Sequence, residues 1–433
     1  DESRNYEELA TDYAQAGNWE DALAVVNAAL TNISAPSTML LYYKAWFLCR
    51  MNQQDEAVCV VSQAENSPLD EYFPNSLEAI LALQCVTNLP IHAPKAFYLL
   101  GNIWYDKRQY QEAVDAWEHS KEMDNGFPTV LRNLSLAYFN KLGKKKEAVQ
   151  LLEQAFMLDE TDARILMELD QLYKRMDYSP KERLHLLNKH KEIIATRDDL
   201  YLEYATLLNL TGEYEQAMQL IDQRQFHPWE GGEGKVPAQY QYARIQLAKK
   251  SLKAGEYEHA LALIEECFVY PHHLGEGKLY GAQENDFLYY KGCILEAMGN
   301  HDEAHSSFTK AASGNGQPTA AMYYNDQKPD KIYYQGLALR KVGKEAEARG
   351  RFNSLISYGE KHLYDTFVMD YFAVSLPDLQ IWEDDMNKKN RIHCHYLMGL
   401  GHLGLGNKEK ADKCFSYIKA VSYTHLTLPT KRI

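Results

Sequence analysis

The stretch that decides the fold is residues 100–117, L-G-N-I-W-Y-D-K-R-Q-Y-Q-E-A-V-D-A-W. It predicts two helices joined by a short turn, with the small residues Gly101 and Ala113 on facing helices. A glycine inside a helix costs about 1 kcal/mol relative to alanine. Gly101 is therefore best explained by the close approach of the paired helix, and Ala113 allows the same approach from the other side.

The second half of this stretch recurs along the chain as a turn, acidic residues, an alanine, three residues and a large apolar residue. The alanine of each copy is Ala22, Ala57, Ala113, Ala148, Ala217, Ala260, Ala304, Ala348 or Ala411. A weaker copy has Arg183 at this position, 35 residues after Ala148 and 34 before Ala217. A period near 34 with this pattern is typical of the tetratricopeptide repeat (TPR), a helix–turn–helix unit.

The sequence thus resembles a TPR protein over nearly its whole length. One helix pair cannot bury its apolar face alone, so neighbouring pairs must stack. We predict an all-α fold: an α-solenoid of about ten TPR-like units that runs through residues 1–420, rather than several globular domains. Glycines follow the first helix of many pairs, where we expect left-handed caps: Gly17, Gly212, Gly255, Gly299, Gly343 and Gly406.

Departures from the period mark insertions. An extra helical insert is expected near residues 69–93. The later units carry long inter-repeat loops, which we place at 226–237, 270–286 and 313–330, followed by an insert at 360–390. Insertions in repeat proteins map to loops on one face, often the binding face, so a functional site is expected among these segments.

Two of these loops share the motif G-E-G-K, at residues 232–235 and 275–278. The two lysines are 43 residues apart, one long unit, so we expect the loops to lie side by side on one edge. The candidate site residues are His227, Trp229, Glu230, Glu233, Lys235, His272, His273, Glu276 and Lys278. They form either a recognition site for a partner surface or polar ligand, or loops that only pack on each other, with lysine bridging glutamate.

A phosphate-binding loop is excluded for this motif. Such a loop needs G-x-x-x-x-G-K followed by serine or threonine, after a strand and before a helix. Val236 and Leu279 follow the two lysines instead, and the element before each loop is a predicted helix.

Tyrosine is unusually frequent, with 31 residues. In five units a tyrosine stands three residues before the small residue of the first helix: Tyr42, Tyr98, Tyr289, Tyr333 and Tyr396. First helices line the concave surface of TPR proteins, so this resembles an aromatic ladder that holds a peptide or a sugar face. The alternative is that these rings pack between adjacent first helices with the hydroxyl exposed.

Composition excludes several other functions. The chain has 60 acidic and 46 basic residues, a net charge of −14, which argues against nucleic acid and an anionic membrane as partners. No apolar run approaches the ~20 residues of a membrane span. The seven cysteines lack a C-x-x-C motif and read as buried residues of a reducing compartment, so we expect a cytoplasmic location.

No catalytic residue, cofactor or metal site is expected. His393, Cys394 and His395 form the one tempting metal cluster. On a helix, however, residues i and i+2 point in different directions, so packed or solvated side chains are the better interpretation.

Both ends of the sequence are unusual. The chain starts at Asp1 rather than methionine, so we expect it to be a piece of a longer protein. Residues 421–433, V-S-Y-T-H-L-T-L-P-T-K-R-I, resemble a translated sequencing-adapter read-through. We interpret this tail as non-native and expect the natural chain to continue beyond residue 420.

Four segments carry a closer resemblance: residues 197–203, 227–235, 274–286 and 393–406. Together they resemble a family of large bacterial proteins in which a mutarotase-like β-sandwich domain precedes TPR repeats. This resemblance implies that a carbohydrate-related N-terminal domain is absent from this chain. It supplies no catalytic residue, because the domain that would hold one is not here.

Three functions follow as hypotheses. The first is a non-catalytic scaffold that docks on, or presents, a carbohydrate-active domain of the same polypeptide through the G-E-G-K loops. The second is a free-standing adaptor that binds a peptide of another protein in the tyrosine-lined groove. The third is a set of solenoid loops that complete a glycoside-processing active site. The expected partners are thus the absent domain or another protein, with a carbohydrate ligand as a further candidate.

Overall fold

The computed structural model describes the whole chain except residues 1, 70–71, 322–325, 368–380 and 422–433. Every regular element within the described residues is a helix, and the helices follow one another as antiparallel pairs. This confirms the predicted all-α solenoid with helix–turn–helix units. The chain divides into two compact units, Asp1–Ile165 and Leu166–Ile433. Continuity of one solenoid through residues 1–420 stays a prediction.

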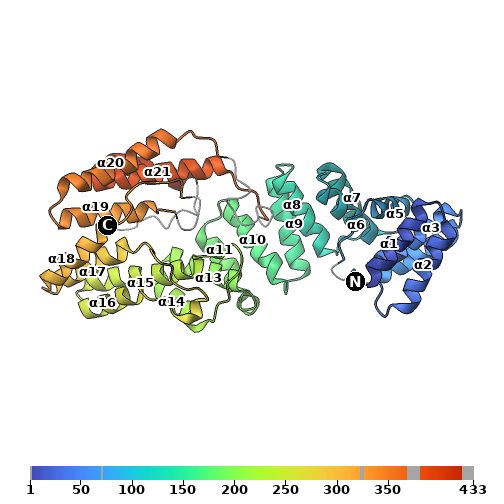
Figure 1. Cartoon of the computed structure of the whole chain (residues 1–433), viewed down its shortest axis with the longest axis horizontal. Helices are drawn as coiled ribbons and strands as arrows, with labels where there is room; N and C mark the ends of the chain where they lie inside the picture. Colours follow the sequence, from blue (N-terminus) through green and yellow to red (C-terminus); the bar gives the residue numbers. More distant parts are fainter. Residues whose placement is uncertain (1, 70–71, 322–325, 368–380, 422–433) are drawn as a thin grey trace. The chain divides into compact units, whose positions relative to one another are not determined.

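The first unit consists of helix pairs in chain order (Figure 1). Its helices are α1 (Glu2–Gln15), α2 (Trp19–Asn32), α3 (Thr38–Arg50), α4 (Gln54–Asn66), α5 (Leu77–Thr87), α6 (Pro94–Asp106), α7 (Tyr110–Met123), α8 (Pro128–Asn140) and α9 (Lys145–Leu158). The pairs are α1–α2, α3–α4, α6–α7 and α8–α9. Helix α5 lies within the insert expected near 69–93 and packs against α3 and α6.

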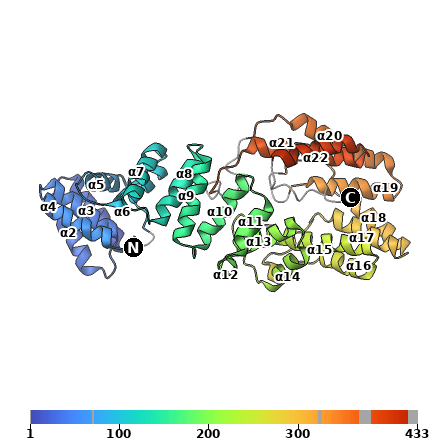
Figure 2. The same cartoon turned by 180° about the vertical axis from the view of Figure 1, so that it is seen from behind.

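The second unit continues the pairing, and α10 crosses the boundary between the units in sequence. Its helices are α10 (Ala163–Arg175), α11 (Pro180–Asn188), α12 (Lys191–Ile194), α13 (Asp198–Thr211), α14 (Tyr214–Gln223), α15 (Lys235–Ala254), α16 (Tyr257–Glu266), α17 (Asn285–Ala297), α18 (His301–Ala311), α19 (Pro329–Lys341), α20 (Glu345–His362), α21 (Met386–Gly404) and α22 (Lys408–Val421). The first helices α13, α15, α17, α19 and α21 contact one another in succession. Figure 2 shows α20 and α21 side by side.

The turn inside each pair follows the predicted left-handed cap. All six expected glycines have a positive φ, from 79° to 95°. Two copies without glycine use the same conformation five residues before the key alanine: Asn52 has φ 62° and Arg108 has φ 61°. The turn geometry is therefore retained even where a side chain makes it costly.

The pairs interlock through a glycine on the first helix and a large ring on the second. A methyl group added at Gly101 would overlap the Trp117 ring, and one at Gly292 would overlap Phe308. Gly336 with Phe352 and Gly399 with Phe415 repeat this arrangement. In every case the ring stands four residues after the key alanine, and all nine key alanines are buried. The expected close approach of paired helices is confirmed.

The weaker copy of the repeat has Arg183 in place of the key alanine, and this arginine forms a buried ion pair. Arg183 of α11 is 1% exposed. Its Nε atom donates to Asp170 Oδ1 of α10 at 3.0 Å, and Nη2 donates to Glu203 Oε1 of α13 at 2.6 Å. A buried charge is tolerated only when it is paired, so α11 is held to α10 and α13 by charge where other copies use a small apolar contact.

The end of the insert at 360–390 folds back onto α10. The ring of Trp382 is fully buried, and its Nε1 donates to the carbonyl oxygen of Glu168 at 3.0 Å. Asp384 forms an ion pair with Arg175 at 3.3 Å. Residues 368–380 of this insert lie outside the described residues. Of the suspected tail 421–433, Val421 is the last residue of α22, and residues 422–433 lie outside the described residues.

Candidate docking site at the paired loops

The carboxylate of Asp198 holds the start of the first G-E-G-K loop, where the chain leaves α14. Asp198, at the start of α13, accepts from Arg224 Nε at 2.6 Å and from the backbone N–H of His227 at 2.9 Å. These bonds lower the pKa of Asp198, although its partial burial acts in the opposite direction. Phe226 between them is buried. The loop is therefore fixed at its start by charge and by an apolar anchor.

Glycines shape the remainder of this loop. Gly231 and Gly234 have φ values of 76° and 70°, and the chain enters α15 directly after Gly234. The Trp229 ring lies against Gly232, where a Cβ atom would overlap it. The glycines thus bring the backbone under the indole, which is held as a half-buried platform on the loop.

The second loop pairs with the first through the backbone. It contains the short 3₁₀ helix η1 (His272–Leu274). The N–H of Phe226 donates to the carbonyl of His273 at 2.8 Å, and the N–H of Gly234 donates to Glu276 Oε2 at 2.8 Å. A Cβ atom at Gly275 would lie 2.7 Å from the Phe226 carbonyl oxygen. The expectation that the loops lie side by side is confirmed.

The lysines of the two motifs do not bridge the loops. Lys278 forms an ion pair with Glu284 and donates to the carbonyl of Phe268 at 2.9 Å, both near its own loop. Lys235 is exposed at the start of α15. The contact across the loops is instead made by Glu276 with a backbone N–H. In the alternative of packed loops with lysine bridging glutamate, the bridge that forms joins Lys278 to Glu284, outside the motif.

A pocket of about 290 Å³ opens where the loops meet. It is lined by His227, Pro228, Trp229, Glu230, Gly232, Glu233, Val236, Leu274 and Glu276. Five of the nine predicted loop residues thus come together here. The other four line no part of it: Lys235, His272, His273 and Lys278.

The two histidines of the second loop are placed differently. His272 is exposed. The His273 ring packs edge-on against Tyr240, with 6.2 Å between ring centroids, and its Nε2 lies 3.9 Å from Asp222 Oδ1. His273 therefore belongs to the packing beneath the loops rather than to the pocket.

Sequence reasoning missed an exposed apolar tip on the second loop, Leu279 and Tyr280. Tyr280 is fully exposed, and Leu279 and Val269 expose more than half of their surfaces. The spacing after the two motifs differs: Lys235 is the first residue of α15, whereas six residues separate Lys278 from α17. These extra residues leave Leu279 and Tyr280 outside any helix pair.

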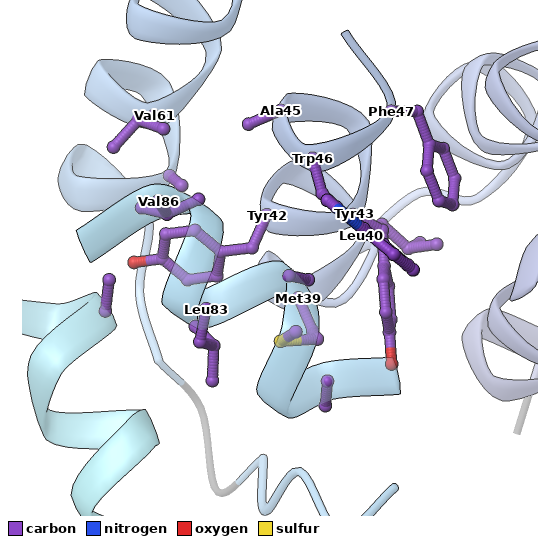
Figure 3. Packing of buried hydrophobic residues seen from close by; sticks show 14 of the residues in the cluster. Met39, Leu40, Tyr42, Tyr43, Ala45, Trp46, Phe47, Val61, Leu83 and Val86 are labelled. Atoms are coloured by element: carbon purple, nitrogen blue, oxygen red, sulfur yellow. The ribbon is translucent and has the colours of Figure 1, made fainter. Parts of the chain in front are cut away.

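The tyrosine ladder is divided between buried and half-buried positions. Tyr42 is buried among Val61, Leu83 and Val86 (Figure 3), and its hydroxyl donates to Glu65 Oε1 at 2.8 Å. Tyr333 is 2% exposed. The remaining three are half-buried: Tyr98, Tyr289 and Tyr396. Tyr42 and Tyr333 therefore serve the core, and a groove role stays a prediction that rests on the other three.

The His393–Cys394–His395 segment is packed. His393 Nε2 lies 2.8 Å from the carbonyl oxygen of Thr319. Cys394 is buried, and the His395 ring is tilted by 33° against that of Tyr417 of α22, with 3.9 Å between ring centroids. Within the described part of the chain, no group of three or more histidine, cysteine, aspartate or glutamate residues could hold a metal. None of the helices described is both long and apolar enough to cross a membrane.

Helix pairs of this kind define the class of α-solenoid repeat proteins, whose stacked units form extended binding surfaces. Residues 130–162, which cover most of α8 and all of α9, match the family described as tetratricopeptide repeat. The chain therefore contains a tetratricopeptide repeat, and its fold is that of a protein-interaction scaffold.

Several solved structures are similar. A tetratricopeptide repeat protein from Parabacteroides merdae is 16% identical, with 70% of this chain and 98% of that chain covered and a TM-score of 0.27. YrrB, a TPR protein with an unusual peptide-binding site, is 13% identical over 53% of this chain and 90% of that one, with a TM-score of 0.30. A chain of the Naa15/Naa10 structure bound to HypK-THB is 11% identical, with 97% of this chain and 64% of that chain covered and a TM-score of 0.35.

Proposed function

We propose that this chain is a non-catalytic scaffold that docks a partner through the paired loops 226–237 and 270–281. The observation that carries the proposal is the hydrogen bonding between the two loops: the Phe226 N–H donates to the His273 carbonyl, and the Gly234 N–H donates to the Glu276 carboxylate. Loops held in this way present a fixed surface, so little entropy is lost when a partner binds. The pocket and the exposed Tyr280 provide that surface with a concave and a convex feature.

The partner that we propose is a carbohydrate-active domain, as the family resemblance implies. The loops of a β-sandwich cluster at its two ends, and we propose that one such end docks on the pocket and the exposed Tyr280. In this arrangement the solenoid positions or presents the domain, while sugar chemistry belongs to the domain.

The experiment measures association between this chain and the carbohydrate-active domain, each expressed separately, by biolayer interferometry. The double variant Trp229→Ala/Tyr280→Ala removes the platform and the tip. We expect it to weaken association by tenfold or more, because buried aromatic residues dominate protein interfaces. The matched control is Tyr364→Ala, which removes another highly exposed tyrosine and leaves association unchanged. Equal affinity of the double variant and the unaltered chain would exclude the loops as the docking site.

Lys278 provides a second, separate test of loop order. It donates to the Phe268 carbonyl and pairs with Glu284, so Lys278→Ala releases the end of the second loop. Docking should weaken and hydrogen exchange in residues 270–284 should increase together. Weaker docking with unchanged exchange would show that Lys278 contacts the partner directly.

Binding and turnover measurements also distinguish the two other hypothetical functions, a groove adaptor and a contribution to a glycoside-processing site. A groove adaptor would lose peptide binding on substitution of Tyr98, Tyr289 or Tyr396 by alanine and would be insensitive to the loop variants. A chain whose loops complete a glycoside-processing site would raise the turnover of the carbohydrate-active domain on mixing, and Trp229→Ala would abolish this rise. Glycoside turnover by this chain alone would contradict the scaffold function.

A further inference from the structure

The pocket between the loops has an apolar wall and an acidic rim. The wall is formed by Pro228, Trp229, Val236 and Leu274. The rim carries three carboxylates: Glu230, Glu233 and Glu276. At about 290 Å³, the pocket lies at the lower end of the roughly 300–1,000 Å³ range of small-molecule sites. It can accept one long side chain but not a folded segment.

The rim carboxylates form no ion pair within the part of the chain that the structure describes. Glu276 is half-buried, and one of its oxygens is oriented by the N–H of Gly234. Its burial and the nearby Glu233 carboxylate raise its pKa. Glu230 and Glu233 are exposed, and neither forms an ion pair with a described residue. Three acidic groups thus share one small opening.

The cations of the neighbourhood are engaged elsewhere. Lys278 pairs with Glu284, and Arg224 pairs with Asp198 at 2.6 Å. His227 lines the pocket, but its Nδ1 faces Asp198 at 3.1 Å. Partial burial and the Lys174 ammonium lower the pKa of Lys235, whereas the carboxylates of Glu203, Glu233 and Asp199 act in the opposite direction. Lys235 lines no part of the pocket. The pocket lining therefore holds three carboxylates and neither a lysine nor an arginine, within a chain whose net charge is −14.

We propose that this pocket binds one arginine side chain of the docking partner. The methylenes of the arginine lie along Leu274 and Val236, its guanidinium plane stacks on the Trp229 indole, and its N–H groups donate to Glu276 and Glu233. Arginine suits this site better than lysine, because its planar, weakly hydrated head group both stacks on aromatic rings and forms forked bonds to carboxylates. The proposal rests on the docking function above and names the chemistry of the partner.

The test uses Nα-acetyl-L-arginine amide and its uncharged isostere Nα-acetyl-L-citrulline amide, titrated into the intact chain. Binding is followed by NMR at the indole N–H of Trp229, assigned with the Trp229→Phe variant. The arginine compound should shift this resonance and bind at least fivefold more tightly than the citrulline compound. Equal binding of the two compounds, or shifts that do not involve Trp229, would overturn the proposal.

Substitutions on the rim separate charge from shape. Glu233→Gln and Glu276→Gln should each weaken arginine binding about two- to fivefold, the range of partly exposed ion pairs, and leave citrulline binding unchanged. Glu160→Gln, which removes an exposed carboxylate of the first unit, is the matched control and should have no effect. An equal loss for both compounds in Glu276→Gln would show that the loop itself had changed, and would count against recognition of charge.

The two proposals fail in different ways. If arginine and citrulline bind equally but Trp229→Ala/Tyr280→Ala still abolishes docking of the partner domain, the loops dock without an arginine. If arginine binds as expected but the partner docks equally well to the double variant, the pocket is real and the docking function is wrong.

Discussion

At the residue scale, helices pack closely where an aromatic ring fills the space left by a glycine on a neighbouring helix. Phe352 shows this most clearly, because its ring is placed against Gly336 of α19 and against Gly404 of α21. One aromatic side chain thus fixes the spacing of three helices. The repeated glycine and aromatic residue are therefore needed for the short distance between paired helices, and these glycines do not indicate a flexible backbone.

This leads to a prediction on stability. Gly336→Ala should lower the free energy of unfolding by about 1–3 kcal/mol, the range observed when a methyl group is forced into a filled core. The matched control is Gly350→Ala in α20, where no atom lies within 4 Å of the added Cβ. That change should stabilise by up to ~1 kcal/mol through helix propensity. Urea unfolding followed by circular dichroism measures both, and a destabilisation of equal size in the two variants would contradict the packing argument.

At the element scale, α21 carries three histidines whose environment disfavours their charged form. Burial lowers the pKa of His393, His395 and His402. For His393 the hydrogen bond to the Thr319 carbonyl acts in the opposite direction, and for His402 the Lys410 ammonium adds to the lowering. The unfolded chain takes up protons near the ordinary histidine value of 6.5, whereas folded α21 takes them up only at lower pH.

Stability should therefore fall as the pH decreases below about 6.5. The sign follows from linkage: in this window the unfolded state binds more protons, so stability rises with pH. His395→Leu should reduce the loss of stability between pH 7 and pH 5.5, because leucine keeps the contact with Tyr417 but does not titrate. The urea midpoint at each pH measures the effect, with the exposed His301→Leu as the control. An unchanged pH slope in His395→Leu would exclude this histidine as a source.

At the scale of the second unit, Trp382 joins parts of the chain that are 214 residues apart, because its Nε1 donates to the carbonyl of Glu168. The ion pair of Asp384 with Arg175 reinforces this junction. A helical repeat array usually contacts only its neighbours. Here the end of an insert returns to α10, so the unit gains a contact that nearest-neighbour stacking does not supply.

Loss of this junction should be visible as local opening. Trp382→Ala should destabilise the unit by about 3–5 kcal/mol, the usual cost of removing a buried large aromatic residue. Hydrogen exchange measured by mass spectrometry should rise in residues 381–385 and in α10, and stay unchanged in α1–α4. Trp382→Phe keeps an aromatic ring at this position but loses the bond to Glu168 and part of the indole, so its effect should be smaller than that of Trp382→Ala. Exchange that rises equally throughout the chain would contradict a local anchor.

The sequence was sufficient to predict those features that repeat. Helix pairing, the left-handed turns and the close approach of paired helices at small residues follow from local patterns, because each unit must solve the same packing problem as its neighbour. That a ring four residues after the key alanine fills the space at the glycine came from the structure. The side-by-side placement of the two loops was also predictable, since Lys235 and Lys278 are one long unit apart. What these features share is that they depend on spacing along the chain.

Only the tertiary structure decided the features that depend on the identity of a distant neighbour. It buried Tyr42 and Tyr333, left Tyr98 half-buried, and directed Lys278 to Glu284 rather than to the opposite loop. It also placed Trp382 on α10. The physical reason is that burial and ion pairing are set by atoms brought together in space, whereas a repeat pattern fixes the backbone but not which side chain meets which.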